Sequence, residues 1–218
     1  MKLWEDFLDL VFPPKCPFCQ KILDDPRAPL CSSCQKELPW LLGEDARRSV
    51  EGTVGCWSPL AYRGAVPDAV HRYKFPGNPA YGVPFGRLAA QCARDHWSGP
   101  VDLVTWVPLS RSRRRQRGFD QAEAMARAAA KELGLPVRGL LEKIRDSGPQ
   151  SHLEKEEDRR TNVQGAYRLR KAELSGLHLL LVDDVVTTGS TLGECARLLV
   201  SGGAKEVWGL TLAQARKN

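Results

Sequence analysis

The residues with the clearest chemical potential lie between Leu179 and Thr191. An apolar run is followed there by two adjacent carboxylates, Asp183 and Asp184, and then by a hydroxyl-rich turn with one glycine. Ligands of parallel α/β sheets bind at the carboxyl ends of strands, so this position suits a binding site. Backbone N–H groups and hydroxyls of a turn that opens into a helix can surround a phosphate monoester. The residues expected around that phosphate are Val186, Thr187, Thr188, Gly189, Ser190 and Thr191.

The two aspartates would then be acceptors for the vicinal hydroxyls of a sugar. A simpler interpretation is that they end a strand and that the turn only caps a helix. A cap needs one hydroxyl residue, whereas four surround Gly189, so ligand binding is the favoured interpretation. The chain contains neither GxxxxGK[ST] nor GxGxxG, which excludes the usual triphosphate and dinucleotide loops.

Four cysteines form two CxxC pairs, Cys16 with Cys19 and Cys31 with Cys34, in a proline-rich segment with few apolar residues. Two such pairs can complete a tetrahedral, all-sulfur site of the kind that binds structural zinc. Four free or buried cysteines, or an iron–sulfur cluster, are the alternatives. Four thiolates leave no coordination position for water, so a catalytic zinc is not expected. The isolated Cys56, Cys92 and Cys195 and the four histidines fit ordinary core or surface roles.

Five arginines crowd into seven residues: Arg111, Arg113, Arg114, Arg115 and Arg117. The run follows a predicted strand and precedes a predicted helix, so we expect a loop at the same sheet edge as the acidic pair. Guanidinium groups bind phosphate oxygens well, so the run could bind a phosphate-rich ligand or a longer polyanion such as single-stranded nucleic acid. Candidate stacking residues are Trp57, Tyr73, Phe75 and Trp106, although each fits the core equally well. The alternative is a solvated charged segment.

The elements expected around these residues are those of an α/β protein with a parallel sheet. Apolar runs predict strands over residues 53–62, 102–107, 177–182 and 206–212, and helical periodicity predicts helices over 85–96, 119–133 and about 191–200. Gly134 should end the second of these helices. Residues 145–165 are expected to form a long polar loop, and Leu3, Phe7, Leu8 and Val11 predict a short amphipathic helix.

Composition narrows the class of protein. The chain has 218 residues, 42% of them hydrophobic and 27% charged, which excludes a wholly disordered protein. A formal net charge of +6 favours phosphate-rich ligands or nucleic acid. No apolar run reaches the ~20 residues of a membrane span, and Glu5, Asp6 and Asp9 interrupt any signal-peptide core. We therefore expect a cytoplasmic protein without membrane insertion.

Residues 179–191 resemble the phosphoribosyl-pyrophosphate (PRPP) binding motif of type I phosphoribosyltransferases. With the CxxC pairs, YKFPGN at 73–78, VPLSRSRRRQRGFDQAEAMA at 107–126, and a pattern over residues 145–166, the chain resembles the ComF competence family, which includes GntX-like proteins. The residues of that pattern are Arg145, Gln150, Leu153, Arg160, Asn162, Gly165 and Ala166. Asp120 stands where this family usually has Asn, and Ser147 where Thr is common.

The resemblance implies a helix and a four-cysteine zinc module over residues 1–45, followed by a type I phosphoribosyltransferase-like domain over 46–218. It implies Mg²⁺-assisted transfer of a phosphoribosyl group from PRPP to an unknown acceptor, with Asp183 and Asp184 as catalytic residues. It also implies that the loop of residues 111–117 contacts pyrophosphate, with at most two of its five arginines in reach and the others left for single-stranded nucleic acid. The alternative is a non-catalytic protein that binds PRPP and single-stranded DNA during natural transformation, with competence or DNA-processing proteins as partners. Residues 43–100 show no motif for recognising an acceptor base or amine.

Overall fold

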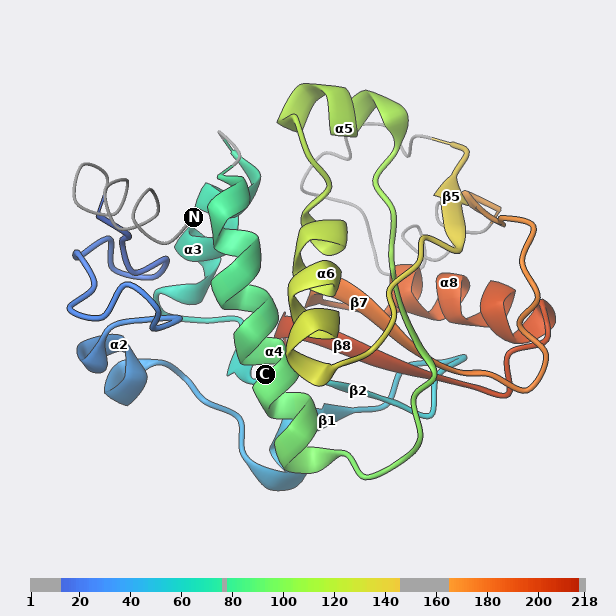
Figure 1. Cartoon of the computed structure of the whole chain (residues 1–218), viewed down its shortest axis with the longest axis horizontal. Helices are drawn as coiled ribbons and strands as arrows, with labels where there is room; N and C mark the ends of the chain where they lie inside the picture. Colours follow the sequence, from blue (N-terminus) through green and yellow to red (C-terminus); the bar gives the residue numbers. More distant parts are fainter. Residues whose placement is uncertain (1–12, 76–77, 146–164, 216–218) are drawn as a thin grey trace.

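The computed structural model describes residues 13–75, 78–145 and 165–215. Its centre is a six-stranded sheet, with a separate two-stranded sheet beside it (Figure 1). The strands are β1 (Arg47–Arg48), β2 (Gly55–Trp57), β3 (Leu60–Ala61), β4 (Leu103–Trp106), β5 (Leu141–Lys143), β6 (Tyr167–Leu169), β7 (His178–Val186) and β8 (Glu206–Gln214). The helices are α2 (Ser32–Glu37), α3 (Val66–Lys74), α4 (Gly82–His96), α5 (Arg111–Arg117), α6 (Gln121–Leu133) and α8 (Ser190–Ser201), with the 3-10 helices η1 (Gly43–Ala46) and η2 (Pro79–Tyr81).

The large sheet has the strand order β1-β2-β8-β7-β4, and β3 also pairs with β8. Every pair in it is parallel except β1 with β2. This mostly parallel sheet confirms the predicted α/β class. β8, the last strand of the described chain, lies at the centre, because it pairs with β2 and β3 on one side and with β7 on the other.

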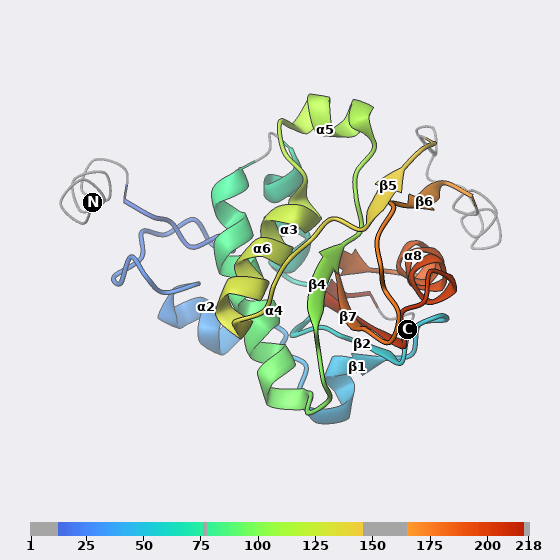
Figure 2. The ribbon, with the colours of Figure 1, turned by 45° about the vertical axis from the view of Figure 1, so that its right-hand side comes forward.

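Helices cover both faces of the sheet, with α4 and α6 on one side and α8 on the other (Figure 2). In β7, Leu180 and Val182 belong to the apolar core under α4 and α6, and Leu179 and Leu181 belong to the core under α8. A strand buried on both faces needs an unbroken apolar run, which is the pattern that predicted it. The helix α6 begins at Asp120, whose side chain accepts the Glu123 N–H, and ends at Gly134 with φ of 69°, as predicted.

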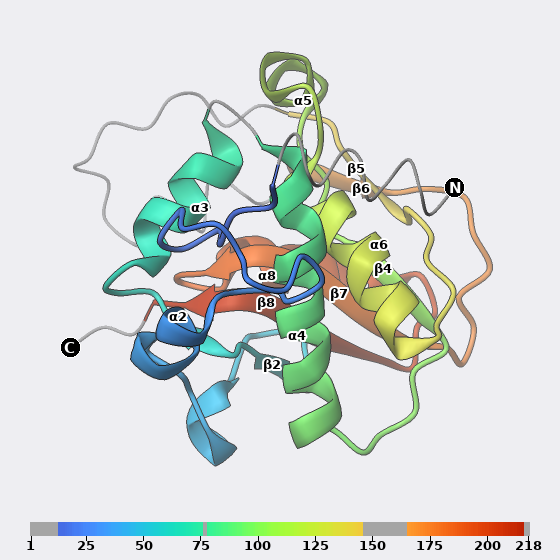
Figure 3. The ribbon, with the colours of Figure 1, turned by 60° about the vertical axis from the view of Figure 1, so that its left-hand side comes forward.

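The helices α4 and α6 approach each other closely through a glycine. A Cβ at Gly86 would lie 2.5 Å from the Cβ of Ala128, so only glycine permits this separation. Residues 13–46 pack on the same layer, because Phe18 and Phe85 have ring centroids 5.6 Å apart and both belong to one core (Figure 3). The four-cysteine segment therefore rests against α4 through apolar contacts, and Arg72 of α3 donates hydrogen bonds to its backbone.

Several predictions of elements differ from the structure. The strand expected over 53–62 is two short strands, β2 and β3, because Pro59 between them has no N–H to donate. The amphipathic helix at residues 1–12 and most of the 145–165 loop lie outside the described residues. Among the described helices, none is long and apolar enough to span a bilayer.

Candidate functional site

The acidic pair lies within strand β7, and the prediction that this strand ends at Val182 is wrong. β7 continues to Val186 because its backbone keeps pairing with β8, with Asp183 opposite Thr211 and Val185 opposite Ala213. Both carboxylates are therefore held by sheet backbone near the carboxyl end of the strand. The Asp184 N–H also donates to Asp183 Oδ1 at 2.8 Å, which fixes the first carboxylate relative to the second.

Lys74 is a residue of this site that the sequence did not single out. Its Nζ lies 2.8 Å from Asp184 Oδ2, and the two side chains are only 24% and 15% exposed. Lys74 ends α3, and the next residue, Phe75, lies under the guanidinium of Arg117 at 4.5 Å. The acidic pair thus faces a lysine from α3, with an arginine from α5 beside that lysine. The only sequence signal for Lys74 is its place in YKFPGN.

The surroundings of Asp183 favour its protonated form. Burial, with the nearby charge of Asp184, raises the pKa of Asp183 to about 8. Asp120, at the start of α6, is also buried, and this raises the pKa of its carboxyl even though it accepts the Leu109 and Glu123 N–H groups. In the free protein Asp183 is therefore mostly a neutral acid at neutral pH.

We expect Asp183→Asn to stabilise the free protein, and by more as the pH rises from about 5 to 8. Between the ordinary pKa of 3.8 and the folded value of about 8, the folded state keeps a proton that the unfolded state releases, so wild-type stability falls with rising pH. This loss reaches about 1.4 kcal/mol for each pH unit in the window. Asparagine cannot ionise, and it keeps the acceptor for the Asp184 N–H.

Urea unfolding at pH 5, 6.5 and 8 in magnesium-free buffer measures this difference. The exposed Asp24→Asn serves as the control, with no pH-dependent gain expected. A gain for Asp183→Asn that stays the same at all three pH values would contradict the buried-acid assignment.

The hydroxyl-rich turn follows β7 directly and opens α8, as predicted. Gly189 has φ of 85°, a left-handed conformation, and the first helical residue is Ser190. Thr188 Oγ1 lies 2.9 Å from Ser190 Oγ and accepts the Ser190 N–H at 3.3 Å. Asp183 and residues 185–192 line one small pocket. The side chain of Val186 is buried, so of this residue only the backbone is left to serve a ligand.

The arginine run forms a helix, α5, and the prediction of a loop is wrong. The Ser110 hydroxyl accepts the Arg113 N–H at the start, and Gly118 with φ of 79° ends the helix. Arginine is a good helix former, so these two caps suffice. α5 projects from the rest of the fold at the carboxyl edge of the sheet (Figures 1 and 2).

Glutamates neutralise part of this helix. Arg111 pairs with Glu142 at 3.0 Å, and Arg114 pairs with Glu123 at 3.3 Å. Arg115 is exposed, and Arg117 is half-buried, which lowers the pKa of its guanidinium. Trp57, Tyr73 and Trp106 are buried and therefore cannot stack on bases, whereas Phe75 is 40% exposed. Phe75 is therefore the one expected stacking residue that is exposed, and the Arg117 guanidinium lies over its ring at 4.5 Å.

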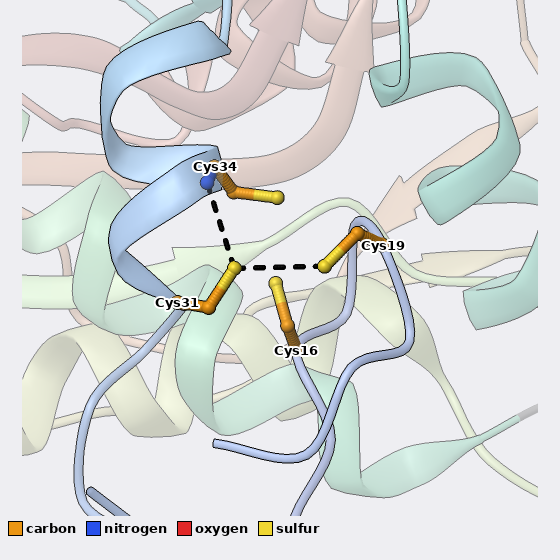
Figure 4. A group of neighbouring side chains, drawn as sticks. All are labelled: Cys16, Cys19, Cys31 and Cys34. Atoms are coloured by element: carbon orange, nitrogen blue, oxygen red, sulfur yellow. Dashed lines mark hydrogen bonds between the residues drawn. The ribbon is translucent and has the colours of Figure 1, made fainter. Parts of the chain in front are cut away.

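The four cysteines of the CxxC pairs converge on one point (Figure 4). All four Sγ atoms lie within 4.8 Å of one another, and Cys19 Sγ and Cys31 Sγ are 3.5 Å apart. Tetrahedral zinc with bonds of about 2.3 Å places its sulfur ligands roughly 3.8 Å apart, so the donor set fits this metal. The Cys34 N–H lowers the pKa of the Cys31 thiol to about 7, whereas burial raises the pKa of Cys34. Cys56, Cys92 and Cys195 are free and buried, as predicted.

Comparison with known proteins agrees with this geometry. A family profile described as a phosphoribosyl transferase domain matches residues 120–218, and one described as a double zinc ribbon domain matches residues 7–46. The DNA utilization protein YhgH of Salmonella typhi is 34% identical over 201 residues, which cover 88% of this chain and 82% of that protein. Competence protein F of Haemophilus influenzae is 28% identical, with 91% and 97% covered. The chain belongs to the ComF family.

Both parts of this ComF-family chain have counterparts in the fold. The phosphoribosyltransferase match begins at Asp120 and includes β7, the turn and α8, and the zinc-ribbon match includes all four clustered cysteines. The fold is a type I phosphoribosyltransferase fold preceded by a zinc ribbon. A solved structure of an allosteric regulatory enzyme of purine biosynthesis overlaps 60% of this chain and 26% of its own, with 21% identity and a TM-score of 0.42.

Proposed function

We propose that this chain binds PRPP at the carboxyl end of β7 and transfers its phosphoribosyl group to an acceptor in the cytoplasm. The observation that carries the proposal is the single pocket lined by Asp183 and by the turn from Thr187 to Thr191. It brings the Asp183 carboxyl, for the ribose, and a helix N-terminus, for the 5-phosphate, within reach of one ligand, and Asp184 is the next residue of the same strand. The family match to a phosphoribosyl transferase domain supports the same ligand.

Each group has a role in this mechanism. The N–H groups and hydroxyls of the turn hold the 5-phosphate, and Asp183 and Asp184 accept hydrogen bonds from the ribose hydroxyls while positive charge develops on the ring. Arginines of α5, among them Arg113 and Arg117, stabilise the departing pyrophosphate. The carboxylates and hydroxyls are oxygen donors of the kind that suits Mg²⁺. Magnesium, when bound, neutralises charge on the leaving group.

Calorimetric titration of the wild-type chain with PRPP and Mg²⁺ tests the binding step. Pyrophosphate release is then measured against a panel of nucleobases and ammonia. Binding with acceptor-dependent release supports a transferase, and binding without release with any acceptor supports the carrier alternative. If the titration gives no heat and the protein retains no PRPP, both the transferase and the carrier alternative are overturned.

A second candidate function, binding of single-stranded DNA, is favoured by the exposed position of α5. Its five arginines exceed what one pyrophosphate can use, and DNA appears in the name of the Salmonella relative. The pairing of Arg111 and Arg114 with glutamates reduces the charge that is available. In this candidate function, DNA phosphates must displace Glu142 from Arg111 and Glu123 from Arg114. Surface ion pairs of this kind are weak, so the displacement costs little free energy.

Under that second candidate, Arg113→Ala with Arg114→Ala should weaken single-strand binding and flatten its salt dependence. Loss of two phosphate contacts reduces the slope of log K against log salt by about 1.4. Fluorescence anisotropy at several salt concentrations measures both quantities. Arg27→Ala with Arg63→Ala, two exposed arginines outside α5, is the charge-matched control. Equal affinity and slope in the two double variants would show that α5 is a solvated helix without this role.

A further inference from the structure

Three consecutive residues at the end of α3 attach to three different parts of the molecule. Arg72 donates from Nη2 to the carbonyl oxygens of Pro17 and Phe18, at 3.0 and 2.7 Å. The Tyr73 hydroxyl donates to the Gln121 carbonyl at 2.8 Å. Lys74 pairs with Asp184 at 2.8 Å. One helical turn therefore contacts the zinc module, the start of α6 and the acidic pair.

The Arg72 contacts lie inside the metal site. Pro17 and Phe18 are the two residues between Cys16 and Cys19, so a metal bound by both thiolates helps to fix the direction of their carbonyl groups. Tyr81 adds a second tie, because its hydroxyl donates to Gln20 Oε1 at 3.0 Å. Both carbonyls accept from the same Arg72 nitrogen, and the planar guanidinium fixes the directions of its two N–H groups.

The middle residue makes this turn rigid. Tyr73 is fully buried and packs edge-on against Phe85 at 5.3 Å and against Phe119 at 5.4 Å. Close-packed side chains transmit a displacement, because they have few alternative arrangements. Arg72 and Lys74 flank Tyr73 in the same helix, so a rigid turn links the positions of these two residues.

The Lys74 contact lies inside the proposed ligand site. Its ammonium sets the direction of the Asp184 carboxylate and places a positive charge beside a ligand that carries several negative charges. Because both side chains are largely removed from water, this pair is screened less than a surface ion pair.

We propose that the end of α3 couples the zinc site to the acidic pair, with Arg72 and Lys74 as positioning residues at its two ends. A closed zinc knuckle holds Arg72, and Arg72 holds Lys74 against Asp184. Ligand affinity then depends on Arg72, which touches neither the ligand nor the carboxylates. Coupling between two sites is reciprocal, so loss of the Lys74 contact also loosens the zinc knuckle. The ligand named here rests on the proposed function.

The test is a double-mutant cycle with Arg72→Met and Lys74→Met, read as PRPP affinity by calorimetry in the presence of Mg²⁺. We expect a five- to tenfold loss for Arg72→Met at one zinc per chain, a loss at least as large for Lys74→Met, and no further loss in the double variant. A purely structural role of Arg72 would persist in the Lys74→Met background and give additive losses. Arg63→Met removes an equal charge from the exposed turn before α3 and should bind as wild type.

Two further measurements keep the outcomes distinct. Should Arg72→Met lose its zinc, Arg72→Lys replaces it in the cycle, because it keeps the charge and removes only the planar fork. Zinc release to a chelator, measured without PRPP, should be several-fold faster in Lys74→Met than in Arg63→Met. Wild-type affinity in a zinc-loaded Arg72 variant, or unchanged zinc release in Lys74→Met, would overturn the coupling. Absence of PRPP binding by the wild type would overturn the proposed function, and zinc release would then decide the coupling alone.

Discussion

Cys31→Ser should reduce the zinc content from near one ion per chain to near zero and should unfold the segment around residues 13–40. Structural zinc in small modules supplies about 10 to 16 kcal/mol of folding free energy, and this segment has few apolar residues to replace it. The substitution removes one metal ligand and preserves the helix cap. Cys31 is also the N-cap of α2, where its Sγ accepts the Cys34 N–H, and serine is a good N-cap. The loss therefore reports the missing metal ligand and not a missing helix cap.

Elemental analysis after gel filtration gives the zinc content, and limited proteolysis reports the unfolding. Ser33→Ala, an exposed change within the same knuckle that keeps all four thiols, should retain its zinc. Zinc near zero in the wild type, or unchanged zinc in Cys31→Ser, would refute the assignment of the four-cysteine cluster as a zinc site.

Gly189→Val should reduce PRPP affinity at least 100-fold. Gly189 has φ of 85°, which β-branched residues avoid, and a Cβ there would lie 3.1 Å from Val50 Cγ1. The turn must therefore move, and its N–H groups leave the positions that a phosphate needs. Calorimetry with PRPP, on protein with native-like circular dichroism, gives the affinity. Gly64→Val provides the control, because Gly64 also has a positive φ but has no neighbouring atom within 4 Å of its Cβ position.

Asp183→Asn with Asp184→Asn tests the other end of the same ligand. Above pH 8, where Asp183 is mostly ionised, each lost charge-assisted hydrogen bond costs about 1.5 to 3 kcal/mol, so the double substitution should lower affinity at least 100-fold in a folded protein. Wild-type affinity in this double variant or in Gly189→Val would show that β7 and its turn do not hold the phosphoribosyl group.

The sequence predicted those parts of the site that are local in the chain. The apolar run from Leu179 to Val182 predicted a strand, because an unbroken run of this kind fits burial on both faces of a sheet. The hydroxyl residues around Gly189 predicted a turn. The position of Lys74 could not be predicted in this way. Its partner Asp184 lies more than one hundred residues further on, and only the packed fold brings the two together.

The errors have physical causes of the same kind. The extension of β7 past Val182 depends on pairing with β8, which periodicity within β7 cannot show. The sequence held cap signals for the helix α5 in Ser110 and Gly118, but the position of the arginine run between a predicted strand and a predicted helix suggested a loop. The burial of Trp57 and Trp106 reflects packing of distant elements, so their aromatic character alone gave no guide to their accessibility.

The central position of β8 has a consequence for the order of assembly during synthesis. Both β2 and β7 pair with β8, which is the last described strand to leave the ribosome. Gly55 of β2, for example, cannot pair until Trp208 of β8 has been synthesised. Pairings between residues so distant form slowly and leave apolar strand edges open in the meantime. The zinc ligands all lie between residues 16 and 34, so this knuckle can close as soon as it emerges. During most of its synthesis the chain can therefore hold a complete metal site, while the phosphoribosyltransferase-like domain still lacks its central strand.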